Sequence, residues 1–296
     1  MKKPKSFILV TGGAGFIGSN LISLLLTKTK FDIISLDNYS TGSKLNHIVN
    51  IRVKYIKGDT KNIFKLIKNP RLIHSVFHFG EFARIYQSFL HMHDCIDSNT
   101  IGSNAVFNFC LKNNIKLIYS ATSATLGNKG NDKNLSPYAF TKAKNLELLE
   151  NLKKWFKFKF EIIYFYNVYG PNQICKGEMA TIIGIFENLY KKRKTLTVVR
   201  PGTQTRRFTH VQDTVEICYL AWKNNKCRHY SISNKYSFSI IEVARMFKSK
   251  IKYLPKRAGE RYASALSNKN LSNKVYSYFG KINLKDYVKS FLEQNS

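Results

Sequence analysis

Short apolar runs alternate with longer segments of helical periodicity over the first 166 residues of this 296-residue chain. Each run is rich in Ile, Leu, Val, Phe or Tyr and ends at a glycine or a polar residue, which is typical of a buried β-strand. The segments between the runs repeat apolar residues every three or four positions, as amphipathic helices do. The expected strands are residues 6–11, 31–37, 53–60, 73–81, 115–120 and 160–166. Strands that alternate with helices predict an α/β fold with a doubly wound parallel sheet.

The alternation loosens after residue 166. Helices are expected at residues 180–190, 213–223, 239–248 and 284–294, and strands at residues 196–199, 208–211, 230–233 and 251–254. We therefore expect a first domain over residues 1–166, rejoined by about residues 207–232, and a smaller mixed α/β lobe over residues 167–296. Open parallel sheets bind ligands at their carboxyl-terminal edge, so this lobe is expected to cover that edge and bind substrate.

Gly12, Gly15 and Gly18 form a Gly-x-x-Gly-x-x-Gly spacing between the first expected strand and the first expected helix. They let the chain turn tightly and let a pyrophosphate approach the helix N-terminus, where unpaired N–H groups favour anions. This context indicates a Rossmann-type dinucleotide site rather than a tight turn without a ligand. Asp37, unless it only caps a turn, is placed to bind the ribose 2′-hydroxyl and to repel a 2′-phosphate, which favours NAD over NADP. Asp59 is placed near the adenine, although aspartate after glycine also serves turns and caps.

Tyr138 and Lys142 lie four residues apart at the start of a helix expected from Ser136-Pro137 to about Phe156. Residues four apart share one helix face, so the ammonium of Lys142 is expected beside the phenol of Tyr138. A tyrosine that works as a base near neutral pH needs its pKa lowered from about 10 to about 7, and adjacent cations act in that direction. An oxidised nicotinamide would be a second such cation. The pair is therefore the expected proton-transfer centre.

The net charge of the chain is extreme, with 48 Lys and Arg against 18 Asp and Glu and a formal value of +30. Such an excess is compatible with a nucleic-acid partner or with attraction of an anionic substrate. The basic residues are spread along the whole chain, however, and no zinc-finger spacing, basic-region heptad or RNA-binding aromatic motif occurs. We expect a compositional bias rather than nucleic-acid binding.

The cysteines and the apolar runs indicate the compartment. Five widely spaced cysteines form no Cys-x-x-Cys pair, so reduced thiols and a cytoplasmic protein are expected; they are Cys95, Cys110, Cys175, Cys218 and Cys227. No apolar run reaches the length of a membrane span, and the run at residues 7–10 fits a buried strand better than a signal peptide. The cluster of His91, His93, Asp94 and Cys95 has no distant partner set, so no metal is expected.

Four motifs follow one another in a distinctive order. They are Thr11-Gly-Gly-Ala-Gly-Phe-Ile-Gly-Ser-Asn20, Tyr138-x-x-x-Lys142, Asn167-Val-Tyr-Gly-Pro171 and Arg206-x-Phe-x-His-Val211. With them the chain resembles, over nearly its whole length, the extended short-chain dehydrogenase/reductase family, specifically its NAD-dependent nucleotide-sugar epimerases and dehydratases. The resemblance implies a nucleotide-sugar, most simply a UDP-sugar, bound under the lobe, and a homodimer paired through a four-helix bundle.

The resemblance also implies the roles of the site residues. Thr122, Tyr138 and Lys142 are the catalytic trio, in which Thr122 hydrogen-bonds the reacting oxygen. The expected cofactor site comprises Gly12, Gly15, Phe16, Ile17, Gly18, Asp37, Asn38, Asp59, Thr60, Phe79, Gly80, Tyr138 and Lys142. The expected substrate site comprises Glu81, Thr122, Asn167, Arg206, Arg257 and Glu260. Two arginines suit a pyrophosphate and a carboxylate suits a ribose diol, although surface charge is the alternative reading of the arginines.

Several positions depart from the family's pattern. Arg207 stands where members carry Asp, and Arg200-Pro-Gly202 replaces a common Gly-Asp-Gly. The segment His78-Phe-Gly-Glu81 replaces His-Leu-Ala-Ala and places an acid near the nicotinamide crevice, whereas His78 itself is expected to be a packed strand-end residue. The loop from Gly127 to Ser136 is short. These differences bear on the identity of the sugar more than on the type of reaction.

The trio suffices for an epimerase that transiently oxidises one carbon of the sugar. Tyr138 takes the proton of the hydroxyl on that carbon while a hydride passes from the carbon to NAD, and the hydride later returns to the opposite face of the same carbon. We expect a UDP-hexose or UDP-N-acetylhexosamine 4-epimerase. A 4,6-dehydratase carries Asp-Glu after the catalytic Thr, where this chain has Ser123-Ala124. The missing acid at these positions also speaks against a decarboxylase. A heptose-nucleotide 6-epimerase stays open, because Lys176-Gly-Glu-Met-Ala180 is similar to that group. A non-catalytic NAD-binding or nucleic-acid-binding protein is the alternative from a different class.

Overall fold

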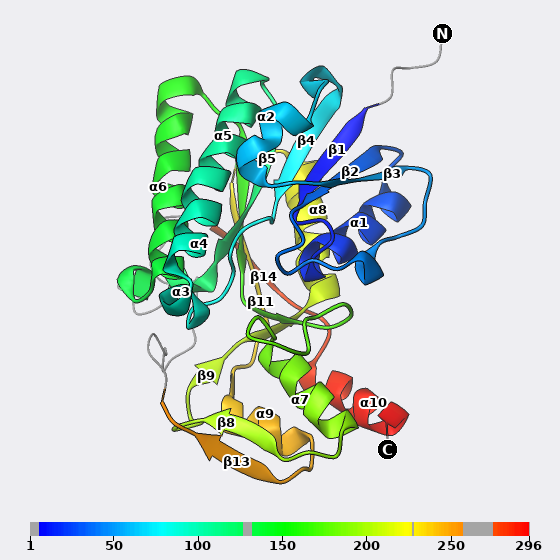
Figure 1. Cartoon of the computed structure of the whole chain (residues 1–296), viewed down its shortest axis with the longest axis vertical. Coiled ribbons are helices and arrows are strands. Elements are labelled where there is room, and N and C mark those ends of the chain that lie inside the picture. The colour runs from blue at the N-terminus through cyan, green and yellow to red at the C-terminus, as the bar shows by residue number, and fades with distance from the viewer. Residues whose placement is uncertain (1–5, 127–131, 227, 257–274, 296) are drawn as a thin grey trace.

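The computed structural model describes residues 6–126, 132–226, 228–256 and 275–295. Its larger part is built on one eight-stranded sheet with the order β14-β11-β6-β5-β4-β1-β2-β3, and a smaller lobe lies below it (Figure 1). All the strand pairs of this sheet are parallel. Its strands are β1 (Phe7–Thr11), β2 (Asp32–Asp37), β3 (Val53–Lys57), β4 (Ile73–His78), β5 (Lys116–Thr122), β6 (Phe160–Phe165), β11 (His229–Ser233) and β14 (Val275–Phe279). The expected doubly wound α/β fold is confirmed.

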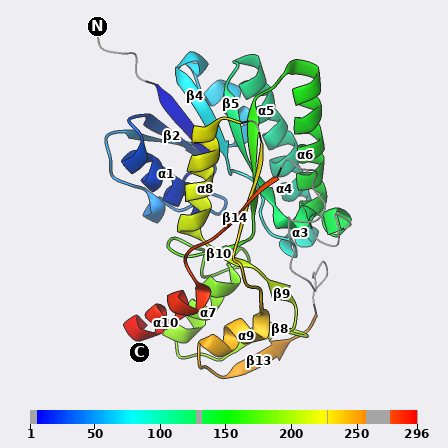
Figure 2. The same cartoon turned by 180° about the vertical axis from the view of Figure 1, so that it is seen from behind.

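Helices cover both faces of the sheet, as the views from front and back show (Figures 1 and 2). One face carries α1 (Phe16–Lys28) and α8 (Val211–Asn224). The other face carries α2 (Ile63–Leu66), α5 (Ser103–Lys112) and α6 (Pro137–Phe156), with the short helices α3 (Gln87–Leu90) and α4 (Met92–Ile96) beside α6. None of the described helices is long and apolar enough to cross a bilayer.

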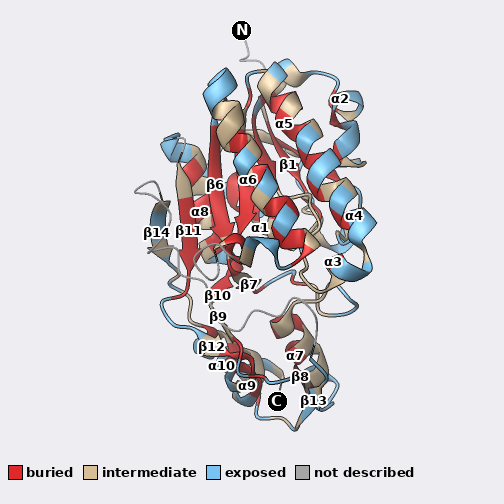
Figure 3. Ribbon diagram, turned by 90° about the vertical axis from the view of Figure 1, so that its left-hand side faces the viewer, coloured by how far each residue is buried: buried red, intermediate tan, exposed pale blue. Residues whose placement is uncertain are grey.

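The strands are apolar along their whole length because both faces of the sheet are buried. In β1, Ile8 and Val10 point into one core with Leu21 and Leu25 of α1, whereas Leu9 points into the opposite core. The strands are accordingly buried and the outward helix faces exposed (Figure 3). This two-sided burial explains why the sequence shows continuous apolar runs rather than strict alternation at these strands.

The lobe has a small core of its own beneath the carboxyl-terminal edge of the sheet (Figure 1). Its elements are α7 (Ile182–Lys191), β8 (Leu196–Val199), β9 (Thr205–Arg206), β12 (Phe238–Ser239), α9 (Ile240–Met246), β13 (Ile251–Leu254) and α10 (Leu284–Asn295). Aromatic rings of α7, α9 and α10 meet there, with Phe247 in contact with Phe186 and Phe291. The parallel pair β7 (Asn167–Tyr169) and β10 (Phe208–His210) lies where the chain passes between the two parts.

The structure differs from the sequence-based elements in three places. The pattern of apolar residues predicts one helix from Cys95 to Leu111, but a π-helical segment, Asp97–Gly102, interrupts it between α4 and α5. Residues 200–207 are predicted from the sequence to form a loop, and the structure has the short strand β9 there. The strand β14 at the sheet edge was not predicted, because only one side of an edge strand is paired and its residues are half-buried or exposed. Both β11 and β14 therefore return from the second half of the chain to the main sheet.

Candidate active site

The glycine turn after β1 packs directly against the exit of β4. Gly12 has φ +70°, and a Cβ atom added there would lie 2.8 Å from the main-chain nitrogen of Gly80. A Cβ atom on Gly18 would lie 2.1 Å from the carbonyl oxygen of Gly12. Only glycine fits such close main-chain contacts. The turn therefore leaves the first amides of α1 facing the carboxyl-terminal edge of the sheet, which suits the pyrophosphate of a dinucleotide.

Asp37 lies beside this turn at the end of β2. Its buried carboxylate accepts hydrogen bonds from the main-chain nitrogens of Ala14, at 2.9 Å, and Tyr39, at 2.8 Å. Burial raises the pKa of Asp37, and these main-chain bonds oppose that rise. Asn38 donates to the carboxylate of Asp59 at 3.1 Å. Asp59 also caps a short helical turn through the amide of Lys61, so the side chain serves a local cap in addition to any contact with an adenine.

His78, at the end of β4, is fully buried and holds the strand exit in place. Its Nδ1 lies 2.7 Å from the hydroxyl of Thr11, and its Nε2 lies 3.0 Å from the hydroxyl of Ser103. Thr11 accepts from the amides of Phe79 and Gly80, both at 3.1 Å, so its proton goes to Nδ1. Burial lowers the pKa of His78 to about 4, which keeps the ring neutral. The expected packing role of His78 agrees with these contacts.

Two of the three expected catalytic residues face one cleft. Thr122 ends β5, and its hydroxyl oxygen accepts from the amide of Ala124 at 3.1 Å, which leaves its proton to donate. Tyr138 lies in the first turn of α6, where Ser136 caps the helix by accepting from the amide of Ala139 at 3.1 Å. Pro at the first helical position and a serine cap explain why α6 begins here. Thr122 and Tyr138 both line the cleft.

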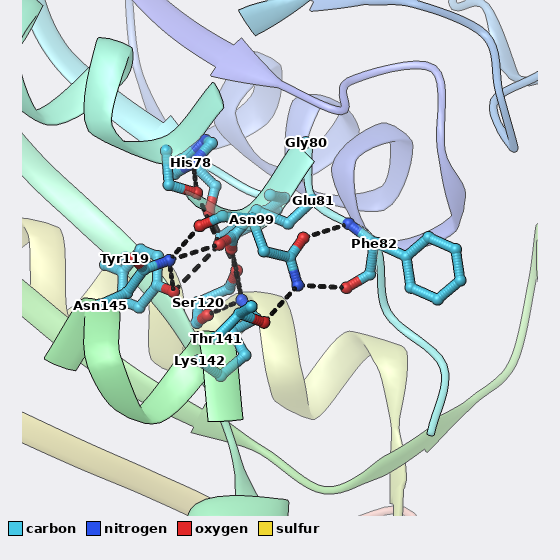
Figure 4. A network of polar contacts seen from close by, with 12 residues as sticks. His78, Gly80, Glu81, Phe82, Asn99, Tyr119, Ser120, Thr141, Lys142 and Asn145 are labelled. Carbon is cyan, nitrogen blue, oxygen red and sulfur yellow. Dashed lines mark hydrogen bonds and ion pairs between the residues drawn. The ribbon is translucent and has the colours of Figure 1, made fainter. Parts of the chain in front are cut away.

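Lys142 follows Tyr138 by one helical turn, but it is not among the described residues that line the cleft. Its ammonium is directed at Ser120 and Glu81 (Figure 4). It donates to the main-chain oxygen of Ser120 and forms an ion pair with Glu81, both at very short range. The ammonium also lies 4.7 Å from the ring centroid of Tyr119. The side chain is only 4% exposed and that of Glu81 only 2%. Glu81 is expected from the sequence to contact the substrate, but in the structure its carboxylate is buried behind the cleft wall.

The cleft has a volume of about 620 Å³ and lies between the sheet edge and the lobe. Phe16 and Ile17, at the start of α1, line one side. Asn167 and Arg206 line it from the second half of the chain. Arg206 is buried and donates to the carbonyl of Thr205 at 2.8 Å. The cleft thus brings together residues expected in the cofactor, catalytic and substrate sites, although these residues lie up to 190 positions apart in the sequence.

The remaining expected residues lie in three places. Phe79 packs its ring edge against Phe165, a residue of the cleft wall, at 5.4 Å between centroids. Thr60 is buried at the start of the turn capped by Asp59. Arg257 and Glu260 lie outside the described residues.

A cluster that no sequence motif indicates joins the loop after β4 to the segment before α7 at the cleft, and we call the place where Arg84 and Gln87 meet Glu178 and Met179 the cleft mouth. Arg84, from the loop after β4, donates through Nε to the carbonyl of Met179 at 2.9 Å and makes a second bond to the same oxygen through Nη2. Gln87 donates to the carbonyl of Glu178 at 2.6 Å, and Nε2 of His91 lies 2.8 Å from the Glu178 carboxylate. Burial lowers the pKa of Arg84, and the nearby Tyr138 phenol raises it. In so basic a chain, no sequence signal distinguishes Arg84 from a surface arginine.

Arg207 departs from the family's pattern in sequence, and its contacts give it a structural role. It donates to the carbonyls of Asn234, at 2.7 Å, and Lys235, at 2.5 Å. It does not line the cleft among the residues described there. Arg207 therefore ties the strand that carries Arg206 to the segment after β11.

Comparison with known proteins extends the geometric picture. A sequence model described as the NAD dependent epimerase/dehydratase family matches residues 8–233. A putative UDP-glucose 4-epimerase of Methanocaldococcus jannaschii is 29% identical over 299 residues of alignment, covering 95% of this chain and 96% of that protein. An ADP-L-glycero-D-manno-heptose-6-epimerase of Brachyspira hyodysenteriae is 28% identical over 81% of this chain and 80% of that protein. The crystal structure of a UDP-glucose 4-epimerase from Thermotoga maritima with UDP-glucose has a TM-score of 0.83, with 24% identity and 97% coverage of both chains, and so shares the fold.

Proposed function

The chain belongs to the NAD-dependent epimerase/dehydratase family, and from that premise we propose that it is a UDP-hexose or UDP-N-acetylhexosamine 4-epimerase. NAD is the cofactor of this family, and the residues fit it. The glycine turn leaves room for a pyrophosphate, and the carboxylate of Asp37 lies beside that turn. Bound NAD supplies the hydride acceptor and, once reduced, the hydride donor.

One observation carries the proposal: Thr122 and Tyr138 face the same cleft as Arg206, while the carboxylate of Glu81 is buried behind it. Tyr138 takes the proton of the sugar hydroxyl and returns it after the sugar has turned. Thr122 donates a hydrogen bond to the same oxygen. Arg206 and Asn167, which line the same cleft, hold the nucleotide diphosphate while the sugar rotates.

The placement of acids favours epimerisation over dehydration. Loss of the C6 hydroxyl needs an acid and a base near C5 and C6. The positions after Thr122 are Ser123 and Ala124, which line the cleft without a carboxylate. Glu81, the other acid near this edge, is ion-paired to Lys142 and does not line the cleft. Among the described lining residues the only carboxylate is Glu178, which bonds to His91.

The test is to incubate the protein with UDP-glucose, UDP-galactose and their N-acetyl forms in deuterated water and to follow C4, C5 and C6 by NMR. A 4-epimerase interconverts the C4 isomers without deuterium at C5 and without added NAD. Deuterium at C5 with a 4-keto-6-deoxy product establishes a dehydratase instead. Tyr138→Phe should lower turnover by at least 10²-fold while NAD still binds. Tyr190→Phe, which changes a tyrosine of α7 with ring contacts in the lobe core, is the matched control.

A second candidate, a heptose-nucleotide 6-epimerase, is favoured by the position of the segment after Lys176. Gly177, Glu178 and Ala180 line the same cleft as Thr122 and Tyr138, so this segment can contact the sugar. The Brachyspira hyodysenteriae relative carries that activity in its name. Turnover of an ADP-heptose at C6, with no reaction of the four UDP-sugars, would replace the 4-epimerase proposal with this one.

A further inference from the structure

Glu81 is a buried carboxylate whose two oxygens are fully engaged by side chains from three other elements (Figure 4). Its Oε1 accepts from Ser103 at 2.8 Å, from Tyr119 at 3.0 Å and from Asn145 at 3.2 Å. Its Oε2 receives the ammonium of Lys142 and, at 3.5 Å, the hydroxyl of Ser120. These five donors on a carboxylate that is 2% exposed fix its position and compensate its desolvation.

The segment that follows Glu81 is fixed as well. The side-chain oxygen of Asn99, in the π-helical segment, accepts from the amide of Phe82 at 2.7 Å, and its nitrogen donates to the carbonyl of Phe82 at 3.0 Å. Asn99 also donates to the hydroxyl of Thr141, the residue before Lys142, at 3.2 Å. The loop that carries Glu81 and the helix that carries Lys142 are thereby held in one arrangement.

Among the described titratable groups around Glu81, Lys142 is the one that carries a charge near pH 7. Burial lowers the pKa of His78 to about 4 and raises that of the Cys95 thiol to about 11, so both are neutral near pH 7. Burial likewise raises the pKa of the Tyr119 phenol far above its usual value. Arg84, in the loop after β4, interacts electrostatically with Tyr138.

We propose that Glu81 is a positioning residue for proton transfer: its carboxylate holds the ammonium of Lys142 and sets the pH range in which Tyr138 and Lys142 carry the charges that catalysis needs. This inference rests on the catalytic role proposed above for Tyr138 and on the pairing of Tyr138 with Lys142 that the sequence predicts. Lys142 is buried, which by itself favours the neutral amine. The adjacent negative charge opposes that effect and keeps the lysine cationic, because opposite charges at contact favour the ionised form.

The sign of the effect follows from the charge alone. A nearby carboxylate favours the protonated form of every neighbouring group, whether that form is an ammonium or a neutral phenol. Removing the charge of Glu81 therefore lowers the pKa of Lys142 and that of Tyr138 together. Activity that requires ionised Tyr138 and protonated Lys142 then moves to lower pH on both limbs of its pH profile. For Lys142, which is in direct contact with Glu81, we expect a displacement of about one pH unit or more, and Tyr138 lies one helical turn from Lys142 on α6.

The experiment compares the pH dependence of kcat/KM for wild type, Glu81→Gln and Glu81→Asp. We expect both limbs of the Glu81→Gln profile to move to lower pH by about one unit, and Glu81→Asp to move less in the same direction. The matched control is Glu161→Gln, which removes another buried carboxylate of the sheet, 3.0 Å from the ammonium of Lys116. If the pH profile of kcat/KM for Glu81→Gln has both limbs at the same pH values as wild type, the proposal is overturned, whatever the absolute value of kcat/KM. If Glu81→Gln does not fold, Glu81→Asp decides by the same criterion.

A second readout does not need turnover. Protein labelled with ¹³Cζ-tyrosine reports the ionisation of Tyr138, whose resonance is assigned by its loss in Tyr138→Phe. Glu81→Gln should lower the apparent pKa of that resonance, with and without bound NAD, and Glu161→Gln should not. If no nucleotide-sugar is turned over but the resonance moves, the proposed function fails and the role of Glu81 stands. If turnover is found and neither readout moves, the role of Glu81 alone is refuted.

Discussion

The guanidinium of Arg84 and the carbonyl of Met179 meet across the cleft mouth, with Nε and Nη2 of the arginine directed at the same oxygen. The first residue belongs to the loop after β4 and the second to the segment before α7. Residues on both sides of this contact line the cleft. The pair therefore joins the loop after β4 to the segment before α7 beside the cleft.

We predict that Arg84→Ala raises the KM for the nucleotide-sugar about tenfold or more, with a smaller change in kcat. Loss of charged hydrogen bonds of this kind costs about 1.5–3 kcal/mol. Steady-state kinetics and NAD titration measure the effect, and NAD affinity should stay near that of wild type. Arg84→Lys separates the effect of the paired hydrogen-bond donors from the effect of the positive charge, because lysine keeps the cation near Tyr138 but lacks the planar pair of donors.

Arg207→Ala is the control for Arg84. Arg207 also bonds to two main-chain carbonyls, those of Asn234 and Lys235, yet it does not line the cleft among the residues described there. An equal rise in KM in both variants would mean that the effect comes from general loosening rather than from the cleft mouth.

Asp37→Ala should weaken NAD binding about tenfold and reduce the preference for NAD over NADP. The carboxylate bonds to the amide of Ala14 in the glycine turn, and it is placed where a 2′-phosphate would be repelled. Isothermal titration of both cofactors measures the ratio of their affinities. Asp32→Ala, at the opposite end of β2, is the matched control. Tighter binding of NADP than of NAD to the wild-type protein would contradict the prediction.

His78 should make the fold less stable as the pH falls from about 6.5 to about 4. Its pKa is about 6.5 when unfolded and about 4 in the folded protein, so the unfolded chain takes up a proton first in this range. The contribution is present above pH 6.5 and is lost as the pH falls through 4, at a total cost of about 3 kcal/mol.

Urea unfolding between pH 7 and pH 4.5 measures this loss. His78→Asn should be less stable than wild type at pH 7, because it disturbs the bonds to Thr11 and Ser103, but its stability should depend less on pH. His93→Asn, a change of an exposed histidine on α4, is the control. A pH dependence in His78→Asn equal to that of wild type would count against the prediction.

We predict a homodimer paired through the helices on the α5–α6 side of the sheet. Ile101 and Phe140 are 54% and 44% exposed there, and Trp155, near the end of α6, is 63% exposed. Large apolar side chains gathered on one face of a helix layer indicate a protein contact. Light scattering should give twice the chain mass of 34.2 kDa. Phe140→Asp should yield monomers, whereas Tyr236→Asp, at an exposed residue of the lobe, should not; a monomeric wild type at micromolar concentration would refute the prediction.

The amino-acid sequence alone is enough to predict which residues gather at the edge of the sheet. Gly12, Asp37 and Thr122 each follow an apolar run, and parallel strands place all their carboxyl ends at one edge. The spacing of Tyr138 and Lys142 determined that they share a helix face. These features depend on local periodicity and on strand direction, which a sequence carries directly.

The directions of individual charged side chains depend on tertiary packing. The sequence placed Glu81 near the crevice, but Ser103, Asn145 and Lys142 turn its carboxylate inward, and these partners come from α5 and α6. Arg84 and Met179 likewise meet only because the lobe folds back over the sheet edge. Such contacts join residues tens of positions apart, and long side chains reach them through rotamers that packing selects, so no sequence spacing encodes them.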